Sequence, residues 1–229
     1  MDTSREVRAG DPRARAAQTK RDRTRSALLA AADAAFGARG WPRTRVEDIA
    51  AAAGVSPATA YNHFPSKHAL IGHVYAPLVR PLVVQAERDI AMRRDVVLSL
   101  TDQVRALVRI MWRHQGLTAA LAAAVQEYLV RVGRPPDPGD DLDPRTLAPL
   151  PTTLQSLIDH GQRTGELRGY PPAPDVSASV INLLLIRVVN HPDDRADDIA
   201  EYFLTMLFGM LRPELLVGAG PGGRPFRRH

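Results

Sequence analysis

The stretch GVSPATAYNHFPSK, residues 54–67, constrains this chain most, because two turn signals enclose a segment with little apolar surface. Gly54 suits the end of a preceding helix, and Ser56 followed by Pro57 suits the start of the next one. Pro65 then stops that helix. The spacing predicts a short helix at 57–64 whose outer face is small and polar, and is therefore available to another molecule.

Two helices are expected before this stretch and one directly after it. The first spans residues 21–39, where apolar residues fall on one helical stripe. The second begins at a capping box, in which Thr44 and Glu47 each satisfy a backbone N–H at the other's end. Ser66 caps a fourth helix that runs towards Pro77. Two short helices joined through a glycine, the second polar outside, are the layout of a helix-turn-helix, whose second helix enters a DNA major groove.

The excess positive charge lies in the same part of the chain. Residues 1–68 carry twelve Lys or Arg and seven Asp or Glu, whereas the rest of the chain carries eighteen of each. A basic segment beside a helix-turn-helix is the electrostatic pattern of a protein that meets a polyanion. The basic arm is compatible with contact to the adjacent minor groove or with a mere rise in non-specific affinity. For Arg5 to Arg15, a solvated basic tail that only raises non-specific affinity is the favoured interpretation.

The match to a known pattern rests on spaced positions. They are Phe36, Gly40, Trp41, Thr44, Ile49, Ala50, Gly54, Val55, Ser56, Tyr61, His63, Phe64, Ser66, Lys67, Ala69 and Leu70. With these residues, the run from Arg23 to Val74 resembles the DNA-binding domain of the TetR family of bacterial transcriptional regulators. Ala60 departs from the pattern, because the family more often has a branched apolar residue there. The remainder of the chain resembles the family only in its helical architecture.

The resemblance implies a set of DNA-contacting residues. They are Arg23, Arg25, Thr44, Arg45, Pro57, Ala58, Thr59, Tyr61, Asn62, His63 and Lys67. Thr44 and Arg45, at the start of the second helix, would contact phosphate and a base edge, and Ala58 would face bases with Thr59. Tyr61, His63 and Lys67 would contact the DNA backbone. For Asn62, a contact with a base and a contact with a phosphate are both compatible with its position. Taken singly, Tyr61 and His63 are equally compatible with packing, and Lys67 with a solvated surface; together they favour DNA.

The predicted fold is all-α. It comprises a flexible basic arm (1–20), a three-helix helix-turn-helix domain (21–74), a helical-bundle domain for effector binding and dimerisation (75–212) and a disordered tail (213–229). Pro77 and Pro81 predict a kink or break, and residues 133–145 a loop. The further expected helices are 82–93, 95–114, 117–131, 145–165, 174–190 and 195–211.

A single helix-turn-helix reads few base pairs, so a homodimer on a palindromic operator is expected. The predicted dimer residues, on the two most apolar helices, are Ile181, Leu184, Leu185, Val188, Tyr202, Phe203, Met206 and Met210. The predicted ligand-pocket residues are Met111, Trp112, His114, Leu121 and Tyr128. The pocket set is equally compatible with the core of one protomer, and part of the dimer set must belong to that core, although a homodimer is favoured. By the family resemblance, the protein is a repressor that a small molecule of unknown identity releases from DNA.

Catalysis, metal binding and cofactors are not expected from this sequence. Cysteine is absent, and no paired-histidine metal motif, phosphate-binding glycine loop or nucleophile motif stands out. The start of the chain lacks a signal-peptide pattern, and no uninterrupted apolar run reaches the roughly 18 residues of a membrane span, so a cytoplasmic protein is expected. The alternatives are an all-helical small-molecule-binding protein or enzyme with incidental DNA binding, and an architectural protein that coats DNA.

Overall fold

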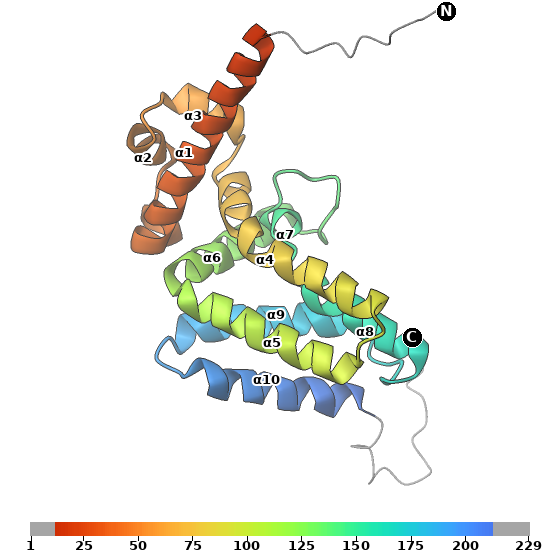
Figure 1. Ribbon diagram of the computed structural model, residues 1–229. Coiled ribbons are helices and arrows are strands. Elements are labelled where there is room, and N and C mark those ends of the chain that lie inside the picture. Colours follow the sequence, from red (N-terminus) through yellow and green to blue (C-terminus); the bar gives the residue numbers. More distant parts are fainter. Residues whose placement is uncertain (1–11, 213–229) are drawn as a thin grey trace, which may run out of the picture.

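The structure, a computed structural model, describes residues 12–212, and every regular element in that range is a helix (Figure 1). The all-α prediction is therefore confirmed. The helices are α1 (Pro12–Arg43), α2 (Val46–Ala52), α3 (Pro57–His63), α4 (Lys67–Ala91), α5 (Val96–Arg113), α6 (Gln115–Val132), α7 (Pro144–Leu147), α8 (Thr152–Thr164), α9 (Ala173–Asn190) and α10 (Ala196–Leu211). Predictions for residues 1–11 and 213–229 lie outside the described residues.

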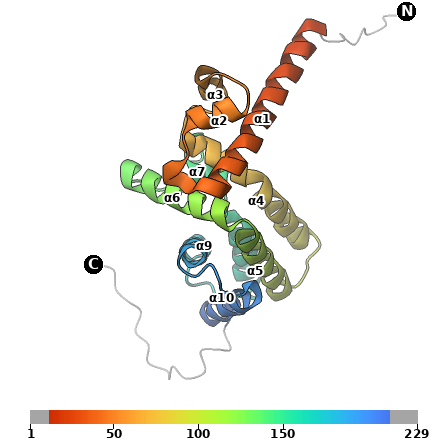
Figure 2. The ribbon, with the colours of Figure 1, turned by 90° about the vertical axis from the view of Figure 1, so that its left-hand side faces the viewer.

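Helix α1 begins earlier than its apolar stripe indicates. The chain is helical from Pro12, so the expectation of a flexible arm is wrong for residues 12–20. Proline suits the first turn, and the alanines, Gln18 and the arginines that follow are favourable helix formers. At the other end, Gly40 adopts φ 70° and interrupts the regular helix before its last residues. Residues 13–23 of α1 are all exposed, and the start of α1 projects away from the molecule (Figure 2).

Helix α4 continues through Pro77 and Pro81, where a kink or break was expected. The two prolines are four residues apart and both exposed, so they share one solvent-facing side of the helix. The carbonyl groups that lose a hydrogen-bond partner can then bind water, which removes much of the cost of an interior proline. The predicted helices 66–77 and 82–93 are thus one element, which connects the N-terminal helices to the bundle.

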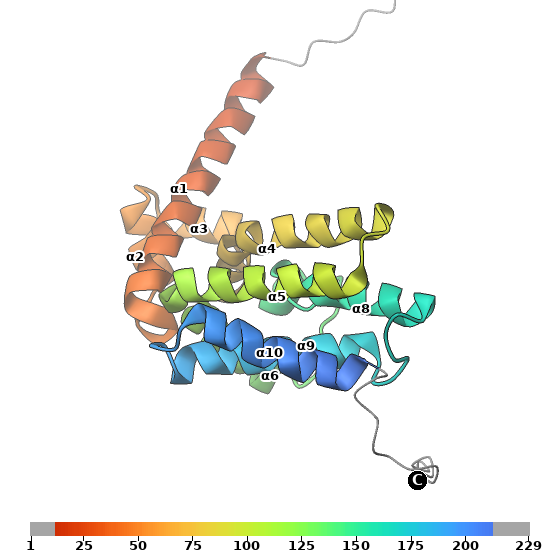
Figure 3. The same ribbon diagram turned by 60° about the horizontal axis from the view of Figure 1, so that its bottom comes forward.

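The predicted helix 145–165 is divided into α7 and α8, because Pro149 and Pro151 fall between them. Four other predictions agree with the structure within two residues at each end, namely α5, α6, α9 and α10. In the bundle, α8 packs against α4, α5 and α9, while α10 packs mainly against α5 (Figure 3). The buried side chains of the bundle form one core with those of the N-terminal helices.

Helices α1 to α3 and the start of α4 form the N-terminal unit, and α1 is also in extensive contact with α6. This contact is close, because a Cβ atom on Gly116 of α6 would lie 2.2 Å from the carbonyl oxygen of Gly37. Two helices, α4 and α9, are long and apolar enough to span a bilayer by length and composition. About half of each apolar window is buried in the fold (50% and 44%), as in the core helices of a packed bundle.

Candidate nucleic-acid interface and effector pocket

Helix α3 turns most of its surface to solvent. The Ser56 hydroxyl accepts a hydrogen bond from the backbone N–H of Thr59 at 3.2 Å and so caps the start of the helix. Ala60 is the one buried residue of α3, and Phe64, directly after the helix, is buried beside it in the small core. The outer face carries Pro57, Ala58, Tyr61 and Asn62. This exposed face meets the steric requirement for insertion into a major groove.

Arg25 of α1 fixes the end of α3 rather than pointing freely outwards. Its Nη1 donates to the carbonyl oxygen of His63 at 3.2 Å, and its guanidinium lies 4.3 Å from the centre of the Phe64 ring. A cation at the C-terminal end of a helix and over an aromatic ring is favourable in both respects. Arg25 therefore positions α3, whereas Arg23 and Arg45 are exposed, as their predicted contacts with phosphate require.

Tyr61 and His63 lie beside charged groups of the neighbouring helices. The Tyr61 hydroxyl donates to Oε1 of Glu47 at 3.3 Å, and burial together with this carboxylate raises the pKa of Tyr61. Burial lowers the pKa of His63, and the positive charges of Arg21 and Arg25 lower it further. At neutral pH His63 is therefore an uncharged hydrogen-bonding group, and Tyr61 is a hydroxyl whose present partner, Glu47, carries the same charge sign as phosphate.

The predicted capping box is wrong. Thr44 is only 1% exposed, and its hydroxyl donates to the carbonyl oxygens of Gly40 at 2.7 Å and of Ala35 at 3.2 Å. The residue that precedes α2 is Arg45, which makes no side-chain cap. Thr44 satisfies carbonyl groups released where Gly40 interrupts α1, so its hydroxyl is not directed at DNA. Its predicted contact with phosphate is therefore wrong for the side chain.

The side chain of Lys67 is bound within the protein and does not extend freely into solvent. Its ammonium group donates to the carbonyl oxygen of Trp41 and lies 4.0 Å from the centre of the Trp41 ring. Burial lowers the pKa of Lys67, and the carboxylate of Glu127 opposes that shift. Lys67 thus attaches the start of α4 to the end of α1, and its contact with phosphate stays a prediction.

Four side chains join the N-terminal unit to the bundle, and we call them the junction cluster: Trp41, His68, Glu127 and Tyr128. The Trp41 indole N–H donates to Glu127 at 2.7 Å, and the His68 ring lies 4.7 Å from the Trp41 ring and 5.3 Å from the Tyr128 ring. Nε2 of His68 is 3.3 Å from a Glu127 oxygen without hydrogen-bond geometry. The sequence reasoning missed this role, because the partners are 86 residues apart and share no local pattern.

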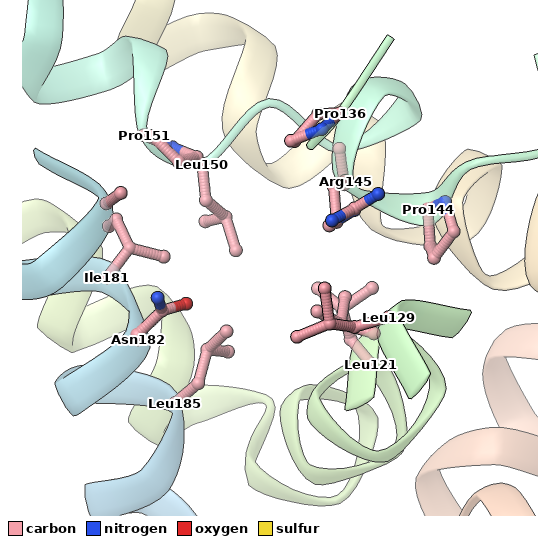
Figure 4. Close-up of a pocket in the computed structure, with 13 residues that line it drawn as sticks. Leu121, Leu129, Pro136, Pro144, Arg145, Leu150, Pro151, Ile181, Asn182 and Leu185 are labelled. Atoms are coloured by element: carbon pink, nitrogen blue, oxygen red, sulfur yellow. The ribbon is translucent and has the colours of Figure 1, made fainter. Parts of the chain in front are cut away.

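A cavity of about 260 Å³ lies between α6, α7 and α9 (Figure 4). Its wall is formed by Leu121, Val125, Leu129, Pro136, Pro144, Arg145, Ala148, Leu150, Pro151, Ala178, Ile181, Asn182 and Leu185. Two polar side chains face it from opposite sides, Arg145 and Asn182. The guanidinium of Arg145 is paired with the buried carboxylate of Asp143 at 2.7 Å. Such a wall suits the apolar part of a small molecule, with Arg145 near an acidic or polar part.

Most of the predicted pocket residues lie elsewhere, and Leu121 is the only one of them that lines this cavity. Met111 is fully buried in the core, and the Trp112 indole donates to the carbonyl oxygen of Asp194 at 2.8 Å. His114 lines a separate hollow between α1, α4 and α6, and Tyr128 donates to Asp140 at 2.7 Å. The prediction failed because an apolar helical pattern is the same for a side chain that packs in the core and for one that lines a cavity.

The predicted dimer residues are also mostly internal. Ile181, Leu184, Leu185, Val188 and Phe203 are buried within the protomer, and Met206 and Met210 are half-buried. Tyr202 is the exception, with 56% of its surface exposed. The exposed apolar residues of α9 lie on the adjacent helical face, and together with Tyr202 they form what we call the outer stripe: Leu183, Ile186, Val189 and Tyr202. The residues predicted for the dimer interface mostly pack in the protomer's own core. A dimer interface on α9 and α10 would therefore use the outer stripe.

The fold and the exposed α3 define a class, the all-helical proteins with an N-terminal helix-turn-helix. Residues 28–74 match the family described as "Bacterial regulatory proteins, tetR family". An uncharacterized HTH-type transcriptional regulator of Mycobacterium bovis is 34% identical over 98 residues, which are 43% of this chain and 44% of that protein. The chain thus matches less than half the length of this relative. Residues 28–74 thus match the DNA-binding part of the TetR family of bacterial regulators, as the sequence resemblance implied.

Solved structures resemble most of the chain. Thermus thermophilus FadR, a TetR-family transcriptional repressor in complex with lauroyl-CoA, has a TM-score of 0.64 and 25% identity, over 87% of this chain and 100% of that one. Bacillus subtilis FadR in complex with stearoyl-CoA has a TM-score of 0.60 and 15% identity, over 80% of this chain and 96% of that one. The likeness extends through the bundle, so it includes the part of the fold in which the cavity lies.

Proposed function

We propose that this protein is a ligand-responsive repressor that binds a palindromic DNA operator as a homodimer. The observation that carries this proposal is the exposed outer face of α3, beside a segment that holds the chain's excess positive charge. Thr59, Ala58 and Asn62 would meet base edges. Arg23 and Arg45 would bind phosphate, together with Tyr61, His63 and Lys67. Such a regulator would act in the bacterial cytoplasm.

Footprinting on DNA from beside the protein's own gene tests this proposal. A repressor of the proposed kind protects a palindrome whose half-sites are about 34–36 Å apart, or a multiple of that distance. Affinity should fall as salt concentration rises, because phosphate contacts release counterions. Diffuse protection along the whole fragment would instead indicate an architectural protein, and lack of binding at low salt would contradict the proposal.

The homodimer is proposed to form through the outer stripe. Ile186 is 55% exposed and Val189 50% exposed. Leu183, Ile186 and Tyr202 line a shallow groove on α9 and α10. Burial of such side chains in a second protomer would release about 25 cal/mol for each Å² of apolar surface.

The dimer proposal predicts that Ile186→Glu yields monomers, because it places a carboxylate in an apolar contact. Val84→Glu, at an exposed apolar position on α4, is the matched control and should leave the mass unchanged. Analytical ultracentrifugation at micromolar concentration measures both. A dimer that persists in Ile186→Glu would place the interface elsewhere.

For the effector, we propose an amphiphile with an acyl chain that occupies the cavity. The support is the apolar wall of the cavity with Arg145 at one side, and the lauroyl-CoA complex of the Thermus thermophilus relative. An anionic group beside Arg145 would compete with Asp143 for the guanidinium. Titration of lauroyl-CoA against the protein on its operator tests this: release of DNA at micromolar ligand supports the acyl chain, and no effect up to millimolar ligand contradicts it.

A further inference from the structure

We propose that the projecting start of α1, residues 12–23, is a rigid second DNA-binding element that contacts the duplex outside the half-site read by α3. This inference rests on the DNA-binding function proposed above. It concerns a segment that the sequence alone suggested to be a flexible arm, and it gives that segment a definite geometry and a partner.

Most of the projection faces solvent. Residues 14–23 are all exposed, and their side chains bond within the helix, such as Gln18 to Asp22 at 2.8 Å and Thr19 to the carbonyl oxygen of Arg15 at 2.9 Å. At 1.5 Å per residue, residues 12–23 extend about 18 Å. Figures 1 and 2 show this part of α1 running past α2 and α3 into solvent. A helix of this length without contacts is marginal alone, so a bound partner would stabilise it.

The composition of the projection selects the chemistry of that partner. Between Pro12 and Leu28 the apolar residues are alanines, so there is no large apolar face for a protein groove or for insertion into a lipid interface. The charges are five cations and one carboxylate from Arg13 to Arg23, distributed around the helix. Long cationic side chains around a thin helix fit a phosphate backbone, which offers charge along its whole length.

The contact between α1 and α3 places the projection near DNA. Arg25 is hydrogen-bonded to the carbonyl group of His63, so α1 passes the end of the reading helix at that residue. Residues that precede Arg25 continue beyond this point on the same rigid helix. DNA seated on the outer face of α3 would therefore pass beside the projection. With base pairs about 3.4 Å apart, a segment of about 18 Å can follow roughly five base pairs of flanking backbone.

The test compares two triple variants that remove the same charge from exposed positions. One is Arg15→Ala, Lys20→Ala, Arg21→Ala in the projection; the control is Arg88→Ala, Arg109→Ala, Arg195→Ala around the bundle. Each is titrated against the footprinted palindrome, either trimmed to its protected core or extended by ten base pairs of flank on both sides. Wild type and control should bind the extended duplex at least tenfold tighter than the trimmed one. The projection variant should bind both equally, with a shallower salt dependence, because each lost phosphate contact removes about 0.9 from the slope of log affinity against log salt.

A second variant separates a rigid helix from a charged flexible tail. Ala17→Pro keeps every charge but breaks the helix between Arg15 and Lys20. It should lose most of the gain from the flanks while retaining the affinity for the trimmed palindrome. The inference would be overturned if the flanks raised the affinity of the projection triple variant as much as that of wild type. The same holds if they raised the affinity of Ala17→Pro as much as that of wild type. If wild type binds no palindrome at all, the proposed function fails instead, which is a different result from either.

Discussion

At the scale of single residues, three polar side chains near the DNA face form hydrogen bonds within the protein itself. Arg25 binds the end of α3, Lys67 binds the end of α1, and Thr44 bonds to carbonyl groups at the kink at Gly40. All three were expected to contact DNA from the family resemblance and from the basic segment beside the reading helix. Sequence indicates which residues are near the interface, but their hydrogen bonds to distant backbone groups depend on tertiary structure.

Arg25→Lys should separate these two roles. Lysine keeps the charge but cannot both donate to the His63 carbonyl and lie flat on the Phe64 ring, so we expect a loss of about 1 kcal/mol in unfolding free energy. DNA affinity should fall alike for all sequences, because the end of α3 loosens. Arg23→Lys, at an exposed position two residues away, should change neither stability nor affinity noticeably. Urea unfolding and gel shifts measure both, and an unchanged unfolding midpoint in Arg25→Lys would contradict the positioning role.

His68 should make the folded state sensitive to acid. Burial lowers its pKa, as do the charges of Arg131 and Lys67, while Glu127 and Asp143 oppose the shift. The unfolded chain then binds more protons between the lowered pKa and about 6.5, so this contribution to stability is complete above about pH 6.5 and is lost as pH falls.

Since one group changes unfolding free energy by at most about 1.4 kcal/mol per pH unit, His68→Asn should flatten the pH dependence by no more than that. The pKa values of His63 and His73 are lowered as well, so some dependence should persist in the variant. Urea unfolding at pH 7.5 and 5.5 measures the difference. Equal loss in wild type and His68→Asn would show that the junction cluster does not carry this effect.

At the scale of elements, the sequence predicted well wherever one apolar face meets one core. Helices α5, α6, α9 and α10 have such patterns, and α3 is enclosed by strong local turn signals. The sequence failed where the decisive feature was exposure, as for the start of α1 and the prolines of α4. The cavity and the junction cluster combine residues from helices far apart in sequence, so no local period could locate them.

The contact between α1 and α6 gives a prediction at this scale. A methyl group at Gly116 would collide with the carbonyl group of Gly37, so Gly116→Ala must separate the two helices. We expect a loss of roughly 1–3 kcal/mol in unfolding free energy, as for other overpacked sites. Gly37→Ala is the control: its methyl group would meet open space, and it should be neutral or stabilise by up to about 1 kcal/mol. Thermal unfolding measures both, and a neutral Gly116→Ala would show that the contact yields easily.

At the scale of the whole molecule, the cavity and the reading head are linked by continuous packing. Arg145 lines the cavity, and its guanidinium lies 5.8 Å from the ring of Tyr128, a member of the junction cluster. From Tyr128 the packing continues through His68 to Trp41, whose carbonyl oxygen accepts from Lys67 at the start of α4. A ligand that moves Arg145 could therefore shift α1 and α4 together, and with them α3.

Such coupling must be reciprocal, because an effector that weakens DNA binding by some factor is itself bound more weakly on DNA by the same factor. Ala178→Phe tests whether the cavity is its origin, since the ring would occupy space that an effector needs. The variant should keep operator affinity within about threefold, and lauroyl-CoA should no longer release it. Gln126→Phe adds the same ring at an exposed position outside the cavity wall and should respond like wild type. If Ala178→Phe still releases DNA at the same lauroyl-CoA concentration, the effector binds elsewhere and the route through Arg145 and the junction cluster is not the one that couples the two sites.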